Sequence, residues 1–209
     1  MDDATTNGRP SPSDEALMAS FRQGDARAFE VLVARHRRGL FNFLLRSVGN
    51  RSRAEELLQD VFVRVIRAKG RYEQTARFST WIYTIARNIC VDESRRAKFR
   101  RTVSLDAPRR GRDGEDGSSL LEATATDEVG VDAASMGPTL QSRLAGAVER
   151  LPEDQREVFL MRQMSGLSFK EIGEVVGAPE NTVKSRMRYA LEKLREELAD
   201  LKELAGPEA

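Results

Sequence analysis

The chain has 209 residues and a net charge of +1, with 40% hydrophobic, 32% charged and 6% aromatic residues. This length allows one domain or two small ones, and no apolar run approaches the length of a membrane span. Cys90 is the single cysteine and His36 the single histidine, so an internal disulfide is excluded and a zinc site is not expected.

The charges are unevenly distributed along the chain. Residues 14–112 contain 22 Lys and Arg against 11 Asp and Glu, whereas residues 113–132 contain seven acids and no base. Residues 139–204 are nearly neutral, with 11 bases and 12 acids. A strongly basic front half indicates a polyanionic partner, and the alternative explanation is a solvated surface.

The first segment, residues 1–12, is polar and acidic without an apolar core, so we expect a disordered lead rather than a secretory signal. Residues 13–101 follow as a front block of successive helices, one of them over residues 54–69. The inward side of that helix is predicted to comprise Leu57, Leu58, Val61, Phe62, Val65 and Ile66. Its outward side is predicted to hold Glu56, Gln59, Asp60, Arg64 and Arg67, with Val63 among them. A polar rim around one apolar residue suits either a solvated surface or a protein-docking face.

The loop RYEQTARFS, at residues 71–79, leads into a helix that carries the only tryptophan, Trp81. A basic run, RRAKFRR at residues 95–101, follows. Aromatic side chains interleaved with cations are typical of surfaces that bind single-stranded nucleic acid, because bases stack on the rings while the cations follow the phosphates. For Phe78, Trp81 and Tyr83 the alternative is burial in the core.

The next segment, residues 102–138, is rich in Gly, Ser, Ala and acidic residues and has no sustained period. This composition predicts a flexible acidic linker between two blocks. A helical back block over residues 139–204 and a short tail over residues 205–209 complete the chain.

The back block contains the pattern of a short helix, a tight turn and a longer helix. The sequence SFKE, residues 168–171, is a capping box that starts the short helix. Gly177 ends this helix, and the longer helix begins about three residues later. The pattern is typical of a helix-turn-helix, although any two-helix hairpin could give it.

The longer helix carries its cations at an unexpected end. Its apolar face is predicted to comprise Val183, Met187, Ala190, Leu191 and Leu194. Lys184, Arg186 and Arg188 lie in the first turns, where the helix macrodipole is positive and cations are disfavoured. Duplex DNA would explain them, because the N-terminal half of such a helix enters the major groove. The alternative is a solvated helix with pairs such as Arg188 with Glu192.

Three stretches of the chain together resemble the extracytoplasmic-function (ECF) sigma factors, the compact members of the bacterial sigma-70-type family. They are AEELLQDVFVRVIRA, RFSTWIYTIARN and LPEDQREVFLMRQMSGLSFKEIGEVVGAPENTVKSRMRYALEKLREEL. The motifs follow the family's order and spacing and cover nearly all of the chain outside the termini and the linker. The resemblance implies an all-α fold of two small helical domains joined by a flexible linker, with a helix-turn-helix in the C-terminal domain.

The resemblance implies a sigma factor that binds core RNA polymerase and directs promoter-specific transcription initiation. The front block would be sigma region 2 and would dock on the β′ clamp coiled coil through Glu56, Gln59, Asp60 and Val63. It would also read the minus-10 element as a melted strand, through Arg71, Tyr72, Arg77, Phe78, Trp81, Arg87, Asn88, Arg95 and Arg96. The back block would be sigma region 4 and would read the minus-35 element as duplex, through Thr182, Lys184, Ser185, Arg186, Arg188 and Tyr189. Tyr189 stands where the family often has an arginine, which leaves base preference there open.

The resemblance also implies partners and a location. The polymerase would offer its β flap as well as the β′ clamp coiled coil, and promoter DNA would be the second partner. An anti-sigma factor would hold the protein inactive, either free in the cytoplasm or at the membrane, without membrane insertion of the chain itself. We expect no catalytic residue, no metal and no cofactor, so the chain is not expected to be an enzyme.

Two other functions compete with this one. The runner-up is an autonomous helix-turn-helix regulator of duplex DNA, with the front block as a sensor or dimerisation module. A sensor would have no use for the basic aromatic segment, which favours the sigma factor. An enzyme that processes nucleic acids lacks candidate catalytic residues in this sequence.

Overall fold

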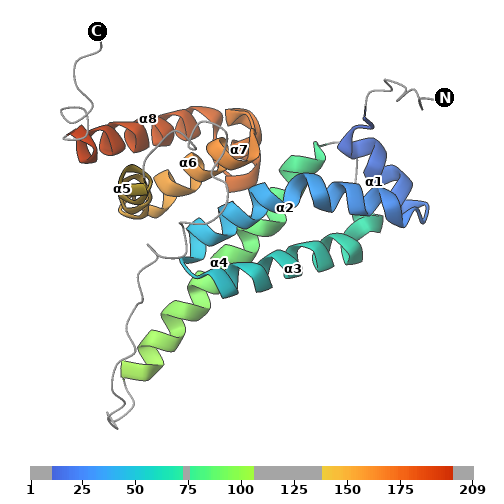
Figure 1. Cartoon of the computed structure of the whole chain (residues 1–209), viewed down its shortest axis with the longest axis horizontal. Helices are drawn as coiled ribbons and strands as arrows, with labels where there is room; N and C mark the ends of the chain where they lie inside the picture. The colour runs from blue at the N-terminus through green and yellow to red at the C-terminus, as the bar shows by residue number, and fades with distance from the viewer. Residues whose placement is uncertain (1–10, 73–75, 106–137, 200–209) are drawn as a thin grey trace, which may run out of the picture.

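The computed structural model describes residues 11–72, 76–105 and 138–199. Its regular elements are α1 (Asp14–Arg22), α2 (Ala26–Val48), α3 (Arg51–Ala68), the short 3-10 helix η1 (Lys69–Arg71), α4 (Phe78–Leu105), α5 (Pro138–Glu149), α6 (Glu153–Ser165), α7 (Phe169–Val176) and α8 (Glu180–Glu197). Every regular element in these ranges is helical, so the predicted all-α class is confirmed (Figure 1). None of these helices is both long and apolar enough to cross a bilayer.

Polar caps and a left-handed glycine set the ends of the front helices. The Asp25 carboxylate accepts hydrogen bonds from the first backbone amides of α2, and the Asn50 side chain caps α3 in the same way. Gly49 ends α2 at a φ of 70°, a conformation that glycine adopts without strain. Because only Gly49 and Asn50 join α2 to α3, the two helices fold back and pack side by side.

The helices α1, α3 and α4 pack around α2 and enclose one apolar core. Leu32 and Leu44 of α2 are fully buried, as are Val61 and Val65 of α3. Ile82 of α4 closes this core from the other side. The front block therefore places its candidate binding residues on the outer faces of α3 and α4.

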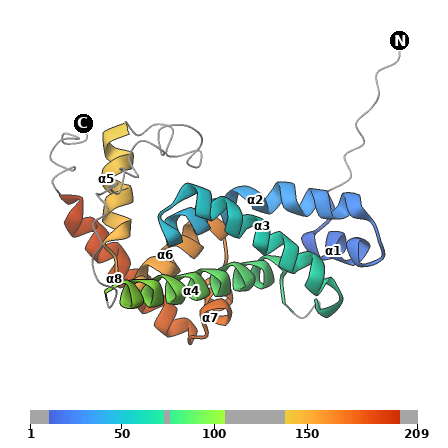
Figure 2. The ribbon, with the colours of Figure 1, turned by 90° about the horizontal axis from the view of Figure 1, so that it is seen from below.

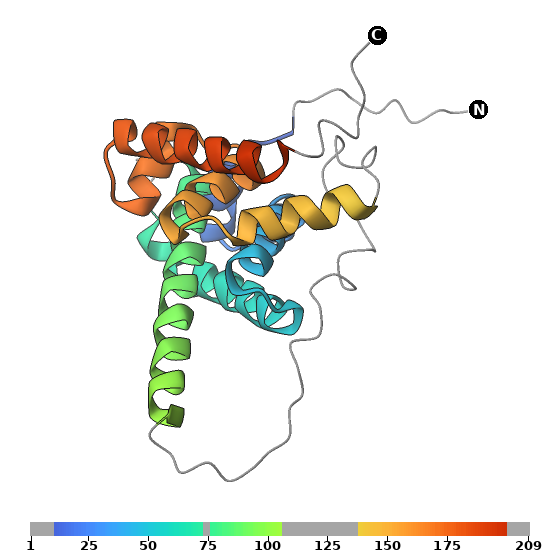
Figure 3. The same ribbon diagram turned by 90° about the vertical axis from the view of Figure 1, so that its left-hand side faces the viewer.

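The helix α4 is longer than the sequence pattern predicts. It continues to Leu105, beyond the expected end of the front block at residue 101, and its C-terminal part projects from the body of the molecule (Figures 1 and 3). No glycine or proline interrupts this stretch, so nothing local ends the helix earlier. Pro138 already belongs to α5. The remainder of the predicted linker, residues 106–137, lies outside the described residues, as do residues 1–10 of the lead and the tail at 205–209.

The back block contains the predicted helix-turn-helix in α7 and α8. The Ser168 hydroxyl accepts a hydrogen bond from the Glu171 amide at 3.2 Å, and the Glu171 carboxylate accepts one from the Ser168 amide at 2.8 Å, so the capping box is confirmed. Gly177 turns the chain at a φ of 69°. A Cβ on Gly173 would lie 2.7 Å from the Ala178 carbonyl oxygen, so the tight turn also requires glycine there.

The two blocks pack against each other, with α6 against α2 and α7 against α4 (Figure 2). A Cβ on Gly39 of α2 would lie 2.8 Å from the Met164 carbonyl oxygen and 2.8 Å from the Tyr83 hydroxyl. The Tyr83 hydroxyl donates a hydrogen bond to that same carbonyl at 3.2 Å. Gly39, which looks like a flaw in the helical pattern of α2, is therefore a point where the backbone of α6 comes too close to α2 for a side chain.

Candidate nucleic-acid interface

The helix α8 buries one face and exposes the other. Val183, Met187, Ala190 and Leu194 are buried, as the pattern predicts. Leu191 was expected on this face, but it is 42% exposed because its position on the helix points it away from the core. Thr182, Ser185 and Arg188 lie on the exposed face together with Tyr189, whose ring lies 4.8 Å from the Arg188 guanidinium carbon.

The three cations in the N-terminal half of this helix each have an acidic partner within the chain. Lys184 pairs with Glu180 at 2.7 Å, one turn earlier on α8. Arg186 reaches across to Asp154 of α6 at 3.1 Å. The expected alternative pair of Arg188 with Glu192 is present as well, at 3.9 Å. The helix therefore offsets its cations internally, and their position alone does not require a bound anion.

These pairs leave the cations available to a stronger ligand. The side chain of Lys184 is 51% exposed and that of Arg188 is 63% exposed. Ion pairs at such exposure contribute about 0–1 kcal/mol, whereas a bidentate contact to a base edge contributes about 1–3 kcal/mol. A nucleic acid could therefore displace the partners of Lys184 and Arg188 at little cost.

The two aromatic residues that flank the loop of the front block are buried, which corrects the expectation of direct DNA contacts. Tyr72 is 2% exposed and Phe78 is fully buried. Their rings pack against each other and against Trp81, with ring centres 5.0–6.0 Å apart. The Tyr72 hydroxyl donates a hydrogen bond to the Ala76 carbonyl at 3.2 Å. Neither ring can stack on a base in this conformation. Of these three aromatic residues, only the half-buried Trp81 keeps part of its side chain accessible.

The remaining candidates of the front block are cations and one amide on η1, on α4 and at Arg77, the residue before α4. Arg71, Arg77, Asn88, Arg95 and Arg96 are exposed. Arg77 is 74% exposed and still pairs with Glu171 of the back block at 3.3 Å. Arg87 is held more firmly, because its guanidinium lies 2.7 Å from the Glu157 carboxylate with both side chains largely covered. Two of the predicted DNA contacts are thus engaged by acids of the other block.

The outer face of α3 is exposed as predicted and is more apolar than predicted. Glu56, Gln59 and Asp60 are exposed around Val63, which is 40% exposed. Ile66 was expected to point inward, but it is 44% exposed and lies one turn after Val63. Its spacing of three residues from Val63 was the signal that could have identified it.

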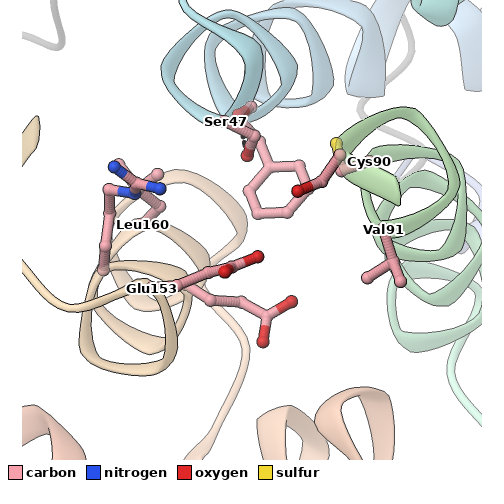
Figure 4. A pocket seen from close by; sticks show the side chains of 9 residues that line it. Ser47, Cys90, Val91, Glu153 and Leu160 are labelled. Atoms are coloured by element: carbon pink, nitrogen blue, oxygen red, sulfur yellow. Dashed lines mark hydrogen bonds between the residues drawn. The ribbon is translucent and has the colours of Figure 1, made fainter. Parts of the chain in front are cut away.

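The two blocks enclose a small pocket lined by Ser47 of α2, Cys90 and Val91 of α4, and Glu153 and Leu160 of α6 (Figure 4). Burial raises the pKa of the Cys90 thiol to about 12. Since the thiolate is the reactive form, this cysteine is inert while the blocks are together. The pocket offers no arrangement of a nucleophile with a base.

Comparison with known proteins assigns both blocks. Residues 32–100 match the description of Sigma-70 region 2, and residues 141–194 match that of Sigma-70, region 4. The chain is 38% identical to the RNA polymerase sigma factor CarQ of Myxococcus xanthus, over 88% of this chain and 97% of the relative. It is 30% identical to the ECF RNA polymerase sigma factor SigW of Bacillus subtilis, over 86% of this chain and 94% of the relative.

Solved structures agree in fold. CnrH in complex with the cytosolic domain of CnrY matches with a TM-score of 0.63 at 25% identity, covering 90% of this chain and 99% of that one. The sigma factor RpoE of Bartonella quintana, solved with the anti-sigma factor NepR, matches with a TM-score of 0.61 at 22% identity, covering 83% and 98%. The order of the two blocks, the helix-turn-helix in the second and the extent of these matches lead to one conclusion: the chain belongs to the ECF sigma factors of the sigma-70-type family.

Proposed function

We propose that this sigma factor directs promoter-specific transcription initiation by reading the minus-35 element as duplex and the minus-10 element as a melted strand. The observation that supports this proposal most strongly is the exposed polar face on the first turns of α8, the helix that follows the tight turn at Gly177. That face presents Thr182, Ser185 and Arg188 where the recognition helix of a helix-turn-helix meets base edges. The polymerase supplies the catalysis, and the chain supplies recognition.

The minus-35 element is read by α8. Arg186 and Arg188 can pair with guanine O6 and N7, while Lys184 and Ser185 suit phosphates. Tyr189 packs beside Arg188, so its ring limits the orientations of that guanidinium. This pairing is the feature of α8 that would distinguish its base preference from that of a helix with arginine at residue 189.

The minus-10 strand is read by the surface of η1 and α4. Arg71, Arg77, Arg95 and Arg96 follow the phosphates, and the open part of Trp81 offers a stacking surface. Arg87 and Asn88 lie between these groups on α4. Tyr72 and Phe78 contribute indirectly, because their buried rings pack against Trp81 and hold it in position.

The polymerase is bound through the outer face of α3. Val63 and Ile66 form an apolar centre, and Glu56, Gln59 and Asp60 surround it as a polar rim, which is the composition of a protein interface. The proposed site on the polymerase is the coiled coil of the β′ clamp, with the β flap as a second contact for the back block. An anti-sigma factor is the third proposed partner, since the similar structure of the sigma factor RpoE from Bartonella quintana holds it in complex with the anti-sigma factor NepR. The proposed location is the cytoplasm, or the membrane when such a partner holds the chain there.

The test is transcription by purified core RNA polymerase, with and without the protein, on a library of genomic upstream fragments. We expect discrete new start sites that require both components and share two upstream sequence elements. Absence of initiation, together with tight duplex binding by the protein alone, would contradict the proposal and favour an autonomous regulator.

A further inference from the structure

The chain connection between η1 and α4 is attached at both described ends to the same helix, α1. The Arg22 guanidinium donates a hydrogen bond to the Tyr72 carbonyl at 3.1 Å. The Glu15 carboxylate accepts a hydrogen bond from the Phe78 amide at 3.0 Å. These partners are 50 and 63 residues apart in sequence, so the contacts are tertiary and not local turns.

The helix α1 is itself fixed firmly to α2 and can serve as an anchor. Its Leu17, Met18 and Phe21 are buried. At its first turn, Asp14 pairs with Arg35 at 2.7 Å and with His36 at 2.6 Å. The N-terminal half of α1 is therefore held against α2. Backbone groups that are hydrogen-bonded to the side chains of α1 are held in a fixed position as well.

The contact at Phe78 completes the beginning of α4. The first amides of a helix have no partner within the helix, and a carboxylate at that end also interacts favourably with the helix dipole. Glu15 supplies this cap from α1, at the residue where α4 begins. The hydrogen bond from the Phe78 amide lowers the pKa of Glu15, so the carboxyl stays charged near neutral pH.

The contact at Tyr72 fixes the other described end of this connection to α1. Its carbonyl is held by Arg22, while its ring is packed against Trp81, with ring centres 5.0 Å apart. Two of the proposed DNA contacts, Arg71 and Arg77, are next in sequence to the two held residues. Their positions relative to each other therefore depend on both α1 contacts.

We propose that Glu15 and Arg22 are positioning residues for the minus-10 strand: they do not touch DNA, but they fix the two ends from which Arg71, Arg77 and Trp81 reach it. This inference rests on the proposed function of the front block. Neither residue lies in the stretch that matches region 2, residues 32–100.

The test uses holoenzyme assembled from core polymerase and the full chain, with a single-stranded DNA pool that has a randomised central segment. Glu15→Ala and Arg22→Ala should each weaken binding of the best wild-type oligonucleotide about threefold to tenfold, the effect of one hydrogen bond. They should also flatten the base preference selected from the pool. Glu15→Gln should restore most of both, because its amide oxygen can still accept from the Phe78 amide.

Matched controls are Glu30→Ala and Arg27→Ala, which remove the same charges from exposed positions on α2. Core affinity and duplex binding by α8 should be unchanged in all variants. Selected preferences identical to wild type in Glu15→Ala and Arg22→Ala would overturn the inference while leaving the proposed function intact. Parallel loss of duplex binding and core affinity would also overturn it, because that pattern indicates misfolding. Failure of the wild-type holoenzyme to select any sequence would remove the proposed function and this inference together.

Discussion

At the scale of single residues, the cations of α8 pair with acids of the chain and are also the proposed contacts to DNA. Arg186 pairs with Asp154 at 3.1 Å in the free chain, and its side chain is only 28% exposed. Binding to DNA requires this pair to break or to share its cation. Under the proposed function, Asp154 therefore competes with the DNA for Arg186.

Arg186→Ala should weaken binding to the minus-35 duplex by about 1–3 kcal/mol if the contact is a bidentate base pair. Asp154→Asn should tighten the same binding, because it releases the cation and removes a negative charge near the DNA. Titration of a labelled duplex measures both. Lys193→Ala, in the C-terminal half of α8, is the matched control and should have a small effect. Equal weakening by Arg186→Ala and Lys193→Ala would show that only overall charge matters.

Glu15 makes a pH-dependent contribution to stability. The hydrogen bond from the Phe78 amide lowers its pKa below the ordinary value of 4.5. A carboxyl with a depressed folded pKa stabilises the fold above its unfolded pKa, and this contribution is lost as the pH falls through the folded value. The difference in free energy of unfolding between wild type and Glu15→Gln should thus be constant from about pH 7 to about pH 5 and shrink below about pH 4.5. Urea unfolding across this range measures it, and a difference independent of pH would contradict the assignment.

Tyr72 and Phe78 illustrate what residue patterns cannot predict. Aromatic residues beside arginines are typical of a surface on which bases stack. The same pattern also occurs where the aromatic rings are buried in the core, so the pattern alone does not distinguish the two. The Phe78 ring packs against the His36 ring of α2 with ring centres 5.2 Å apart, and Arg22 of α1 binds the Tyr72 carbonyl. Both positions therefore depend on helices that lie far away in sequence. For Arg186 and Arg188 the pattern correctly predicted a helix and its exposed side, but it could not reveal Asp154, which comes from another helix.

At the scale of elements, α3 presents a continuous apolar centre on its outer face. Val63 and Ile66 are 40% and 44% exposed and are separated by one turn. Single exposed apolar residues are ordinary, whereas two adjacent ones inside a polar rim are typical of a docking face. The helix α3 packs mainly against α2, α4 and η1 of its own block, so the proposed binding of polymerase there does not require separation of the two blocks.

Ile66→Asp should lower the affinity for core polymerase by about 1–3 kcal/mol, because it places a charge in the apolar centre of the proposed interface. Val31→Asp is the matched control, since Val31 is 39% exposed on α2. Fluorescence titration of labelled protein with core polymerase measures the affinity, and duplex binding checks folding. Equal losses at Ile66 and Val31 would contradict a docking face centred on α3.

The sequence predicted the existence of these helices better than their orientation. An apolar repeat of three and four residues identifies a helix wherever it is long, as in α3 and α8. The same repeat leaves the edge of the apolar face uncertain by one position, which is why Ile66 and Leu191 were placed inward. The capping box at Ser168 fixed one boundary correctly because its signal is local, whereas the end of α4 had no such signal.

At the scale of the whole molecule, the two blocks close over part of the proposed DNA surface. Arg77 and Arg87 pair with Glu171 and Glu157 of the back block. Gly39 permits this closure, because a Cβ there would meet a backbone carbonyl at 2.8 Å. These contacts join residues far apart in sequence, so no local pattern could predict them.

Gly39→Ala should separate the blocks while leaving each folded. Alanine is the better helix former by about 1 kcal/mol, so any loosening must come from the clash and not from the helix. Cys90 reports the change, because it lines the pocket between the blocks and is the only cysteine. We expect faster labelling by a thiol reagent in Gly39→Ala than in wild type.

The control is Gly70→Ala, where an added Cβ meets nothing within 4 Å. Its labelling rate should equal that of wild type. An unchanged rate in Gly39→Ala would show that the back block accommodates the methyl group by shifting within the closed arrangement. That result would contradict the role of Gly39 as the residue that permits closure.

The most direct test of the account as a whole is footprinting of a promoter bound by core polymerase and this protein. DNase protection reports duplex contacts, and permanganate reactivity of thymines reports melted strand. The account predicts protection of the minus-35 element as duplex and reactive thymines in the minus-10 element, both requiring polymerase and protein together. Protection of duplex by the protein alone, with no reactive thymines when polymerase is added, would contradict it.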